Sequence, residues 1–209
     1  FTGSVKVGKN IEKIMKESGN TLKKYIPELG GNAAFVVADD ADLDIASDIA
    51  LSSFDNAGQR CTAIKRILLF NDVADKFIDK FILKVKKMKY GDPFDENSDL
   101  GTLIDKESAD SILKKVNNAV NSGAKLLYGN IVKGALYSPT VLDCVSPDME
   151  LVRYETFGPI APIIRVDSIE ECIKIVESTP YKLAGAISTK SFEKAKEYSD
   201  AISVGQFSW

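Results

Sequence analysis

The stretch AAFVVADDADLDIASDIALSSFDNAGQRCTAIKRILLF, residues 33–70, carries a complete strand–helix–strand pattern. Its first seven residues, AAFVVAD (33–39), form a short apolar run of the kind found in buried strands. The acidic residues of DDADLD (39–44) suit the N-cap and first turn of a helix near 42–57. RILLF (66–70) is a second short apolar run, so we expect one strand, one helix and a second strand.

The same alternation continues on both sides of this stretch. VGKNIEKIMKES (7–18) places Val7, Ile11, Ile14 and Met15 on one helical face. Further helices are expected over 73–88, 106–123, 168–178 and 192–202, and further strands over 124–129, 139–145, 161–166, 183–189 and 204–209. Strands that alternate with amphipathic helices predict an α/β protein with three layers, α/β/α, around a mostly parallel sheet.

In such sheets, ligands gather at the carboxyl ends of the strands. The turn at 56–61 follows the first helix of the opening stretch and precedes its second strand. We therefore expect this turn at the rim of the sheet.

Composition places the chain among ordinary globular proteins. Of its 209 residues, 44% are hydrophobic and 27% charged, and the net charge is −3, which favours neither nucleic acid nor an anionic membrane as a partner. No apolar run approaches the ~20 residues of a membrane span, and no signal peptide is visible. Three widely spaced cysteines indicate reduced thiols and a cytoplasmic location. Without histidine or clustered cysteines, we expect no metal site.

The turn NAGQRCTAIKR (56–66) holds one of these cysteines, Cys61. A lone cysteine is often a small buried hydrophobe, and Cys144 and Cys172 fit that interpretation, on a predicted strand and on the apolar side of a predicted helix. Cys61 is instead followed and preceded by cations, which favours a reactive thiolate. Both interpretations of Cys61 remain open on these residues alone. Papain-like and caspase-like chemistry is excluded, because it requires a histidine.

Three other stretches contain groups that suit chemistry or ligand binding. In PELGGN (27–32), Glu28 supplies a carboxylate before two glycines that allow close approach to a ligand; the alternative is an exposed charge at a strand end. In YETFGPIAP (154–162), an acid and an aromatic lie on a rigid loop that either holds a hydroxylated planar ligand or plugs the fold. FTGSVKVG (1–8) has glycines around a helix start, where N–H groups and the helix dipole favour phosphate.

These four stretches, in this order, resemble motifs of the NAD(P)-dependent aldehyde dehydrogenase superfamily, and DADLD (40–44), GDP (91–93) and LGTLID (100–105) resemble its spacers. The resemblance covers essentially the whole chain. It implies that residues 1–30 end a dinucleotide-binding domain and that residues 31–209 form a catalytic domain truncated at its C-terminus. The opening on FTGS, without methionine, also suggests a piece of a longer protein, which by itself would bind dinucleotide poorly.

The resemblance implies roles for individual residues. Cys61 would attack the aldehyde and form a thiohemiacetal and then a thioester, and Glu28 would activate the water that hydrolyses it. Contacts to NAD or NADP would come from Gly3, Ser4, Gly8, Leu29, Glu155 and Phe157. Arg60 and Thr62 would lie on the substrate side. The partners implied are a small-molecule aldehyde and further copies of the same chain, in a homo-oligomeric dimer or tetramer.

The substrate is a finer question. GQRCTAIKR (58–66) with GALYSPTVLD (134–143) looks most like phosphonoacetaldehyde dehydrogenases, and next like non-phosphorylating glyceraldehyde-3-phosphate dehydrogenases. Both oxidise small anionic aldehydes, and the guanidinium of Arg60 has the geometry to bind a phosphonate or phosphate. Alternatively, Arg60 only favours the thiolate or forms a salt bridge.

Two rival functions stay open. One is a CoA-acylating relative, in which a thiol replaces water at the thioester; Glu28 speaks against it, because acyl transfer needs no such base. The other is a non-catalytic domain for binding or assembly, and the intact set of Cys61, Glu28 and Glu155 speaks against that.

Overall fold

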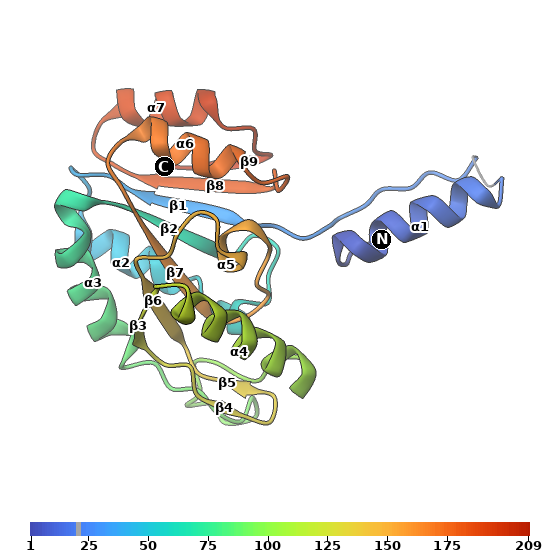
Figure 1. Ribbon diagram of the computed structural model, residues 1–209, viewed down its shortest axis with the longest axis horizontal. Coiled ribbons are helices and arrows are strands. Elements are labelled where there is room, and N and C mark those ends of the chain that lie inside the picture. The colour runs from blue at the N-terminus through green and yellow to red at the C-terminus, as the bar shows by residue number, and fades with distance from the viewer. Residues whose placement is uncertain (20–21) are drawn as a thin grey trace.

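The computed structural model describes residues 1–19 and 22–209 and contains a seven-stranded sheet in the order β3-β6-β7-β2-β1-β8-β9 (Figure 1). The strands are β1 (Ala33–Val37), β2 (Ile64–Phe70), β3 (Lys125–Tyr128), β6 (Thr140–Asp143), β7 (Ile160–Val166), β8 (Ala184–Ser188) and β9 (Gln206–Ser208). All neighbours pair in parallel except β3 and β6. The expected α/β fold with a mostly parallel sheet is confirmed.

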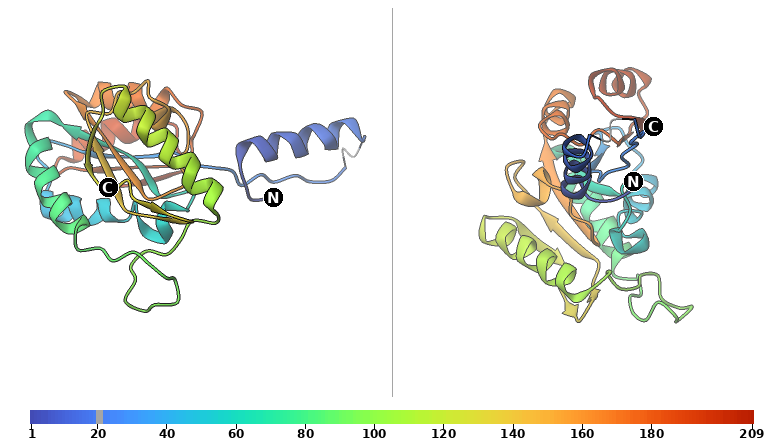
Figure 2. Two further views of the ribbon diagram at one scale, coloured as in Figure 1. Left: turned by 60° about the horizontal axis from the view of Figure 1, so that its bottom comes forward. Right: turned by 90° about the vertical axis from the view of Figure 1, so that its right-hand side faces the viewer.

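Helices cover both faces of this sheet (Figure 2). The bounds are α2 (Leu43–Leu51), α3 (Asn71–Val85), α4 (Lys106–Asn121), α5 (Glu150–Arg153), α6 (Ile169–Glu177) and α7 (Phe192–Ala201). The chain moves from β1 to β2 in one direction across the sheet and from β7 to β8 in the other. Because parallel crossovers are right-handed, α2 and α3 lie on one face and α6 and α7 on the opposite face.

The structure corrects the sequence prediction in three places. The helix expected near 42–57 ends at Leu51, and a short 3₁₀ turn (Asp55–Gly58) follows, in which Asn56 and Ala57 have φ of 53° and 52°. A two-stranded hairpin of β4 (Val132–Lys133) and β5 (Leu136–Tyr137) was not predicted, because its two-residue strands are too short to show periodicity. The four-residue helix α5 was missed for the same reason.

The core lies between the sheet and its helices. Three phenylalanine rings pack together in this core: Phe54, which follows α2, and Phe77 and Phe81 of α3. The centroid of the Phe81 ring lies 6.0 Å from that of Phe54 and 5.6 Å from that of Phe77. All three side chains are fully buried. This packing fixes the segment that leads from α2 into the turn at 55–58.

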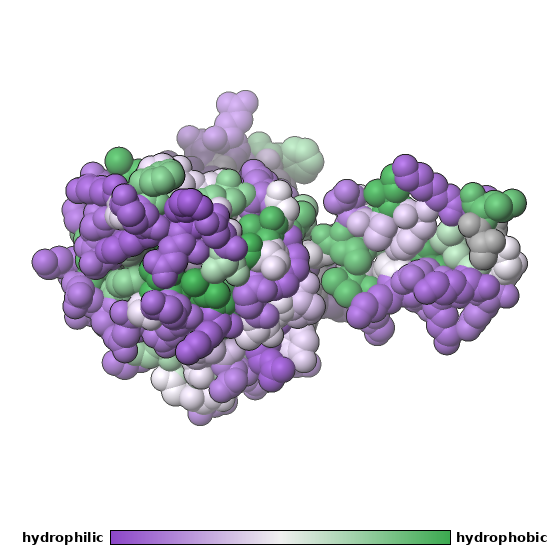
Figure 3. Space-filling model, turned by 90° about the horizontal axis from the view of Figure 1, so that it is seen from above, coloured by the Kyte–Doolittle hydropathy of each residue, from purple (hydrophilic) through white to green (hydrophobic). Residues whose placement is uncertain are grey.

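An arm formed by helix α1 (Val5–Glu17) and the segment that returns from it extends away from this body (Figures 1 and 2). The apolar helical face predicted from periodicity is largely exposed, with Val7 at 47% and Ile14 at 53%. The space-filling view shows the arm as a separate lobe with both hydrophilic and hydrophobic surface (Figure 3). In the part of the chain that the structure describes, no helix has the length and apolar character needed to cross a membrane.

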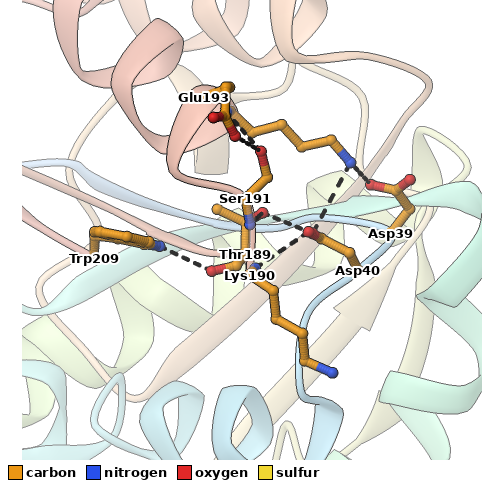
Figure 4. Close-up of polar contacts among 8 residues, drawn as sticks. Asp39, Asp40, Thr189, Lys190, Ser191, Glu193 and Trp209 are labelled. Atoms are coloured by element: carbon orange, nitrogen blue, oxygen red, sulfur yellow. Dashed lines mark hydrogen bonds and ion pairs between the residues drawn. The ribbon is translucent and has the colours of Figure 1, made fainter.

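A polar network joins the carboxyl ends of β1 and β8 (Figure 4). The carboxylate of Asp40 accepts hydrogen bonds from Thr189 Oγ1 at 2.7 Å and from Lys190 N at 3.2 Å, and Lys194 pairs with Asp39. Burial opposes ionisation of Asp40, but these hydrogen bonds and the charge of Lys194 hold its pKa below the usual range. These contacts, all within the chain, join the segment that follows β1 to the segment that follows β8.

Candidate active site

Three of the four stretches singled out in the sequence meet at the amino-terminal edge of the sheet. The GGN segment (30–32) precedes β1, the nucleophile turn (58–63) precedes β2, and the TFGP segment (156–159) precedes β7. Because β7, β2 and β1 are adjacent parallel strands, their starting ends lie side by side. The expectation that ligands gather at the carboxyl ends is wrong for these residues, since each motif comes before its strand.

Glycines allow these loops to touch. A Cβ on Gly31 would lie 1.9 Å from the carbonyl oxygen of Cys61, and a Cβ on Gly58 would lie 2.0 Å from that of Gly158. Gly58 also has φ of +70°, which side chains disfavour. The amide of Gly31 donates a hydrogen bond to Glu155 Oε1 at 3.1 Å. Residues far apart in sequence therefore form one compact site.

Hydrogen bonds of the Gln59 side chain hold the nucleophile turn in place, and Cys61 on this turn is exposed to solvent. Gln59 Nε2 donates to Thr102 O at 3.2 Å, and its Oε1 accepts from Ile104 N at 3.0 Å. These two hydrogen bonds tie the turn to the segment before α4. The side chain of Cys61 is exposed, as a nucleophile needs to be.

The other two cysteines differ from Cys61. Cys172 is buried in α6, and burial raises the pKa of its thiol to about 12. Cys144 is half-buried and was expected on a strand, but it lies just after β6 with φ of 54°. The prediction for Cys144 was wrong because a strand pattern does not show where the strand ends.

The cations near Cys61 have different environments. Arg60 is exposed, and its Nη2 lies 3.4 Å from Asp55 Oδ2. Lys65, in contrast, is buried: its Nζ donates to the carbonyl of Gly58 and lies 5.0 Å from the centroid of the Phe157 ring. Burial lowers the pKa of Lys65 to about 8, although the nearby Glu155 and Cys61 favour its charged form.

Arg66, the third cation, holds the backbone of the segment before β1 in place. Its Nη2 and Nε donate to the carbonyl oxygen of Asn32 at 2.6 and 3.0 Å, and its Nη1 donates to Ile175 O at 3.2 Å. Asn32 in turn donates from Nδ2 to Val152 O at 2.7 Å. The buried guanidinium thus holds the GGN segment against the start of β2.

Glu155 and Phe157 border a hollow of about 370 Å³ that Gln59 and Lys115 also line. Burial raises the pKa of Glu155, opposed by the Gly31 N–H and by Lys65 and Lys115. Phe157 is 46% exposed, so it does not plug the fold. The buried Thr156 hydroxyl has no hydrogen-bond partner among the described residues. A carboxylate and a partly exposed aromatic ring at this hollow fit a hydroxylated planar ligand such as part of a dinucleotide.

The arm holds Glu28 and the other predicted residues that precede β1. Glu28 is exposed, and its backbone is paired with the first residues of the chain: its N–H donates to Phe1 O at 2.8 Å and its C=O accepts from Gly3 N at 3.0 Å. The Glu28 carboxylate has no hydrogen bond or ion pair within residues 1–19 and 22–209. The structure therefore leaves this carboxylate free, two residues before the loops that surround Cys61.

The glycines expected to contact phosphate have other partners. The N–H of Gly3 is bound to Glu28, and the N–H of Gly8 donates to Ser4 O at 2.9 Å. A Cβ on Gly8 would lie 2.6 Å from Leu29 Cδ2, so this glycine allows the returning segment to pack on α1. The hydroxyl of Ser4 caps the helix at Val7 N. Gly3 and Gly8 thus shape the arm, and their own N–H groups are not free for phosphate.

Exposed Thr62, next to Cys61 in the sequence, borders a second hollow of about 240 Å³ between α2 and the sheet. Within residues 1–19 and 22–209, no group of three or more Cys, Asp or Glu side chains is placed to hold a metal ion. The site therefore has an exposed thiol on a turn whose backbone contacts Gly31, and a buried ammonium that binds the same turn at Gly58.

The structure combines a mostly parallel α/β sheet with an exposed cysteine on the turn before β2 and a glutamate–aromatic loop before β7. The chain belongs to the aldehyde dehydrogenase family, whose model matches residues 1–209.

Known proteins are similar to this chain over part of their length. A benzaldehyde dehydrogenase of Bacillus subtilis is 35% identical over 206 residues, covering 98% of this chain and 42% of the relative. An NADP-dependent glyceraldehyde-3-phosphate dehydrogenase of Streptococcus equinus is 36% identical, with 98% and 42% covered. The structure of a glyceraldehyde-3-phosphate dehydrogenase from Methanocaldococcus jannaschii complexed with NADP matches with a TM-score of 0.92 at 41% identity, covering 100% of this chain and 44% of that one. The chain thus spans less than half of these relatives.

Proposed function

We propose that the protein carrying this chain oxidises a small aldehyde to a carboxylate with NAD or NADP, using Cys61 as nucleophile. The observation that carries the proposal is the meeting of three loops at the starts of β1, β2 and β7, which sets the exposed Cys61 against Gly31 and the Glu155 loop. Membership of the aldehyde dehydrogenase family supports the same reaction.

The chemistry follows from the residues present. The Cys61 thiolate attacks the carbonyl carbon of the aldehyde, and the resulting thiohemiacetal becomes a thioester when it loses hydride. A bound nicotinamide cofactor supplies the hydride acceptor. Glu28 then removes a proton from water, the water attacks the thioester, and the carboxylate product leaves as the Cys61 thiol is restored.

The proposed cofactor contacts lie on two parts of the chain. Glu155 and Phe157 border the larger hollow at the site, which Gln59 and Lys115 also line. Ser4, Gly3, Gly8 and Leu29 belong to the arm and would shape the phosphate side. Because the glycine N–H groups are occupied, the free N–H groups at the start of α1 are the ones left for a phosphate.

For the substrate we infer a small anionic aldehyde, such as phosphonoacetaldehyde or glyceraldehyde 3-phosphate. The similarity to glyceraldehyde-3-phosphate dehydrogenases supports this inference, and so does the guanidinium next to Cys61. An uncharged aldehyde is the alternative, in line with the benzaldehyde dehydrogenase relative. A homo-oligomer and a cytoplasmic location stay predictions.

The test is a pair of variants in the full protein. Cys61→Ser should abolish aldehyde oxidation. Glu28→Gln should keep a single-turnover burst of reduced cofactor but lower steady-state turnover on the order of 100-fold, because thioester hydrolysis loses its base. Glu96→Gln, in an exposed loop, is the control and should behave like the native protein.

Stopped-flow absorbance of the reduced cofactor separates the burst from the steady state. Unchanged steady-state turnover in Glu28→Gln would remove Glu28 from the mechanism. Formation of acyl-CoA instead of carboxylate would replace the proposal with the CoA-acylating alternative.

A further inference from the structure

A fourth loop lies at the amino-terminal edge of the sheet, beside the three that form the site. It is the segment TPYKL (179–183), which precedes β8, and β8 is a direct neighbour of β1. A Cβ on Gly31 would lie 3.3 Å from Leu183 Cδ2, so this segment packs against the GGN segment. The site therefore includes a loop that none of the four sequence motifs covers.

Tyr181 of this loop binds the backbone of Glu155. The N–H of Glu155 donates a hydrogen bond to the Tyr181 hydroxyl at 3.2 Å. The C=O of Glu155 accepts a hydrogen bond from Lys115 Nζ, on α4, at 3.3 Å. Within residues 1–19 and 22–209, the main chain of Glu155 forms no hydrogen bond to another backbone group. Two side chains from distant elements therefore hold the backbone at this position.

The Glu155 carboxylate lies between the GGN segment and the larger hollow. Its Oε1 accepts a hydrogen bond from Gly31 N at 3.1 Å, and a Cβ on Gly30 would lie 2.0 Å from its Oε2. The same residue borders the hollow of about 370 Å³, whereas Tyr181 lies outside this hollow. The Tyr181 hydroxyl can therefore act on a ligand in the hollow only through Glu155.

The position of Tyr181 is fixed by the backbone that follows it. The carbonyl oxygen of Lys182 accepts a hydrogen bond from Gly205 N at 2.9 Å. The carbonyl oxygen of Leu183 accepts one from Gln206 N, where β9 begins, also at 2.9 Å. The side chain of Tyr181 is half-buried. A group that is itself held in this way can fix the geometry of a ligand-binding side chain.

We propose that Tyr181 is a positioning residue, whose hydroxyl fixes the backbone of Glu155 and so holds the Glu155 carboxylate ready for a cofactor hydroxyl in the hollow. The inference rests on the proposed function, in which Glu155 contacts NAD or NADP. Holding a binding side chain in place reduces the conformational freedom that is lost when the ligand binds. Loss of the Tyr181 hydroxyl should therefore weaken cofactor binding.

The first test compares two substitutions of tyrosine by phenylalanine in the full protein. Tyr181→Phe removes only the hydroxyl, and Tyr128→Phe, at a half-buried position in β3, is the matched control. Isothermal titration calorimetry gives the dissociation constant for NAD and for NADP. Tyr181→Phe should raise the constant of the tighter cofactor about 5-fold, because one hydrogen bond of ordinary strength is lost. Tyr128→Phe should change it less than about twofold.

A double-mutant cycle tests whether Tyr181 acts through Glu155. In a Glu155→Ala background the backbone hydrogen bond remains but the carboxylate is gone, so Tyr181→Phe should change the dissociation constant less than about twofold. A hydroxyl that only stabilises the fold would weaken binding by the same factor in both backgrounds.

Hydrogen–deuterium exchange tests the contact itself, without a cofactor. Exchange of the Glu155 amide, followed by mass spectrometry in peptides that cover residues 152–158, should become faster in Tyr181→Phe on the order of 10-fold, since this amide loses its acceptor. Tyr128→Phe should leave the exchange rate unchanged.

An unchanged dissociation constant in Tyr181→Phe would overturn the proposal. Equal weakening in the native and Glu155→Ala backgrounds would overturn it too, as would an unchanged exchange rate of the Glu155 amide. Failure of the proposed function looks different, because the native full protein would then bind neither NAD nor NADP, whatever the exchange rate of that amide.

Discussion

At the scale of single residues, two cations that lie close to Cys61 in the sequence differ in how deeply they are buried. Arg60 lies on the turn before β2 and stays in solvent, whereas Lys65 is inside the strand and is buried. Both are cations within four residues of the same thiol. The strand begins at Ile64, and this boundary separates the exposed cation from the buried one.

Arg60 is the residue that tests the choice of substrate. Because its guanidinium is exposed and its pairing with Asp55 is long at 3.4 Å, we expect a moderate contribution to anion binding. Arg60→Ala in the full protein should lower kcat/KM for glyceraldehyde 3-phosphate about 10-fold, which corresponds to about 1.4 kcal/mol, and should change that for propionaldehyde less than about twofold.

Steady-state kinetics with both aldehydes measures this difference. Arg60→Lys keeps the charge without the fork and should recover part of the loss. Equal losses for the charged and the neutral aldehyde would show that Arg60 does not bind the anionic group.

At the scale of elements, the site depends on loops that precede strands, and the strands depend on polar clamps at their other ends. Arg165 of β7 is such a clamp: its guanidinium contacts Asp143, at the end of β6, at 2.9 Å and Asp75 of α3 at 2.6 Å. The Asp143 side chain is 5% exposed. Two strands and one helix are therefore joined through the Arg165 guanidinium, whose partner on β6 is a buried carboxylate.

We expect Asp143→Asn to lower the free energy of unfolding by about 2 kcal/mol at pH 7, because Arg165 loses charged hydrogen bonds and keeps only its exposed partner Asp75. Asp75→Asn, whose side chain is 85% exposed, is the control and should cost less than about 0.5 kcal/mol. Urea denaturation followed by circular dichroism measures both values. Equal stability of the Asp143→Asn variant and the native chain would contradict this account.

The same pair gives a pH dependence. Burial opposes ionisation of Asp143, but hydrogen bonds from Arg165 and from the Cys144 N–H hold its pKa below the usual range. The folded pKa is below the unfolded one, so the stabilisation is complete above about pH 4 and is lost as the pH falls through the folded value. The difference in stability between native chain and Asp143→Asn should therefore shrink in acid.

At the scale of the whole molecule, the arm and the body differ in how they are stabilised. The body has a continuous core around its sheet, whereas the arm exposes apolar side chains such as Val7, Ile14 and Ile26. This contrast supports the proposed division into residues 1–30 and 31–209. Exposed apolar surface of this kind marks a face that is suited to further packing.

We predict that residues 1–209 alone bind NAD or NADP weakly. The Glu155–Phe157 hollow and the start of α1 supply only part of a dinucleotide site, and the arm is held to the body by little more than the chain itself (Figure 1). Isothermal titration calorimetry should give a dissociation constant above about 100 μM, an affinity weaker than about 5.5 kcal/mol. A low-micromolar constant would contradict the prediction and indicate a different binding site.

Local patterns in the sequence determined the kinds of element and most of their positions. Apolar runs and helical periodicity predicted the strands around 33–39, 66–70 and 161–166 and the helices over 73–88 and 106–123, because each pattern depends only on near neighbours. The resemblance of four motifs to those of the aldehyde dehydrogenase superfamily indicated Cys61, Glu28 and Glu155 as candidate functional residues. The end of the helix near 42–57 and the placement of Cys144 were wrong, since the boundaries depend on caps and on left-handed residues that periodicity does not register.

The tertiary structure alone decided where these residues meet. Pairing of β7 with β2 and of β2 with β1 brings the loops before them together at the amino-terminal edge of the sheet, opposite to the edge that the general rule predicts. The same pairing buries Lys65 under Phe157 and leaves Arg60 in water. Strand order and burial arise from contacts between residues far apart in the chain. For that reason the sequence indicated candidate functional groups, and only the fold decided which of the neighbouring cations is buried and which is exposed.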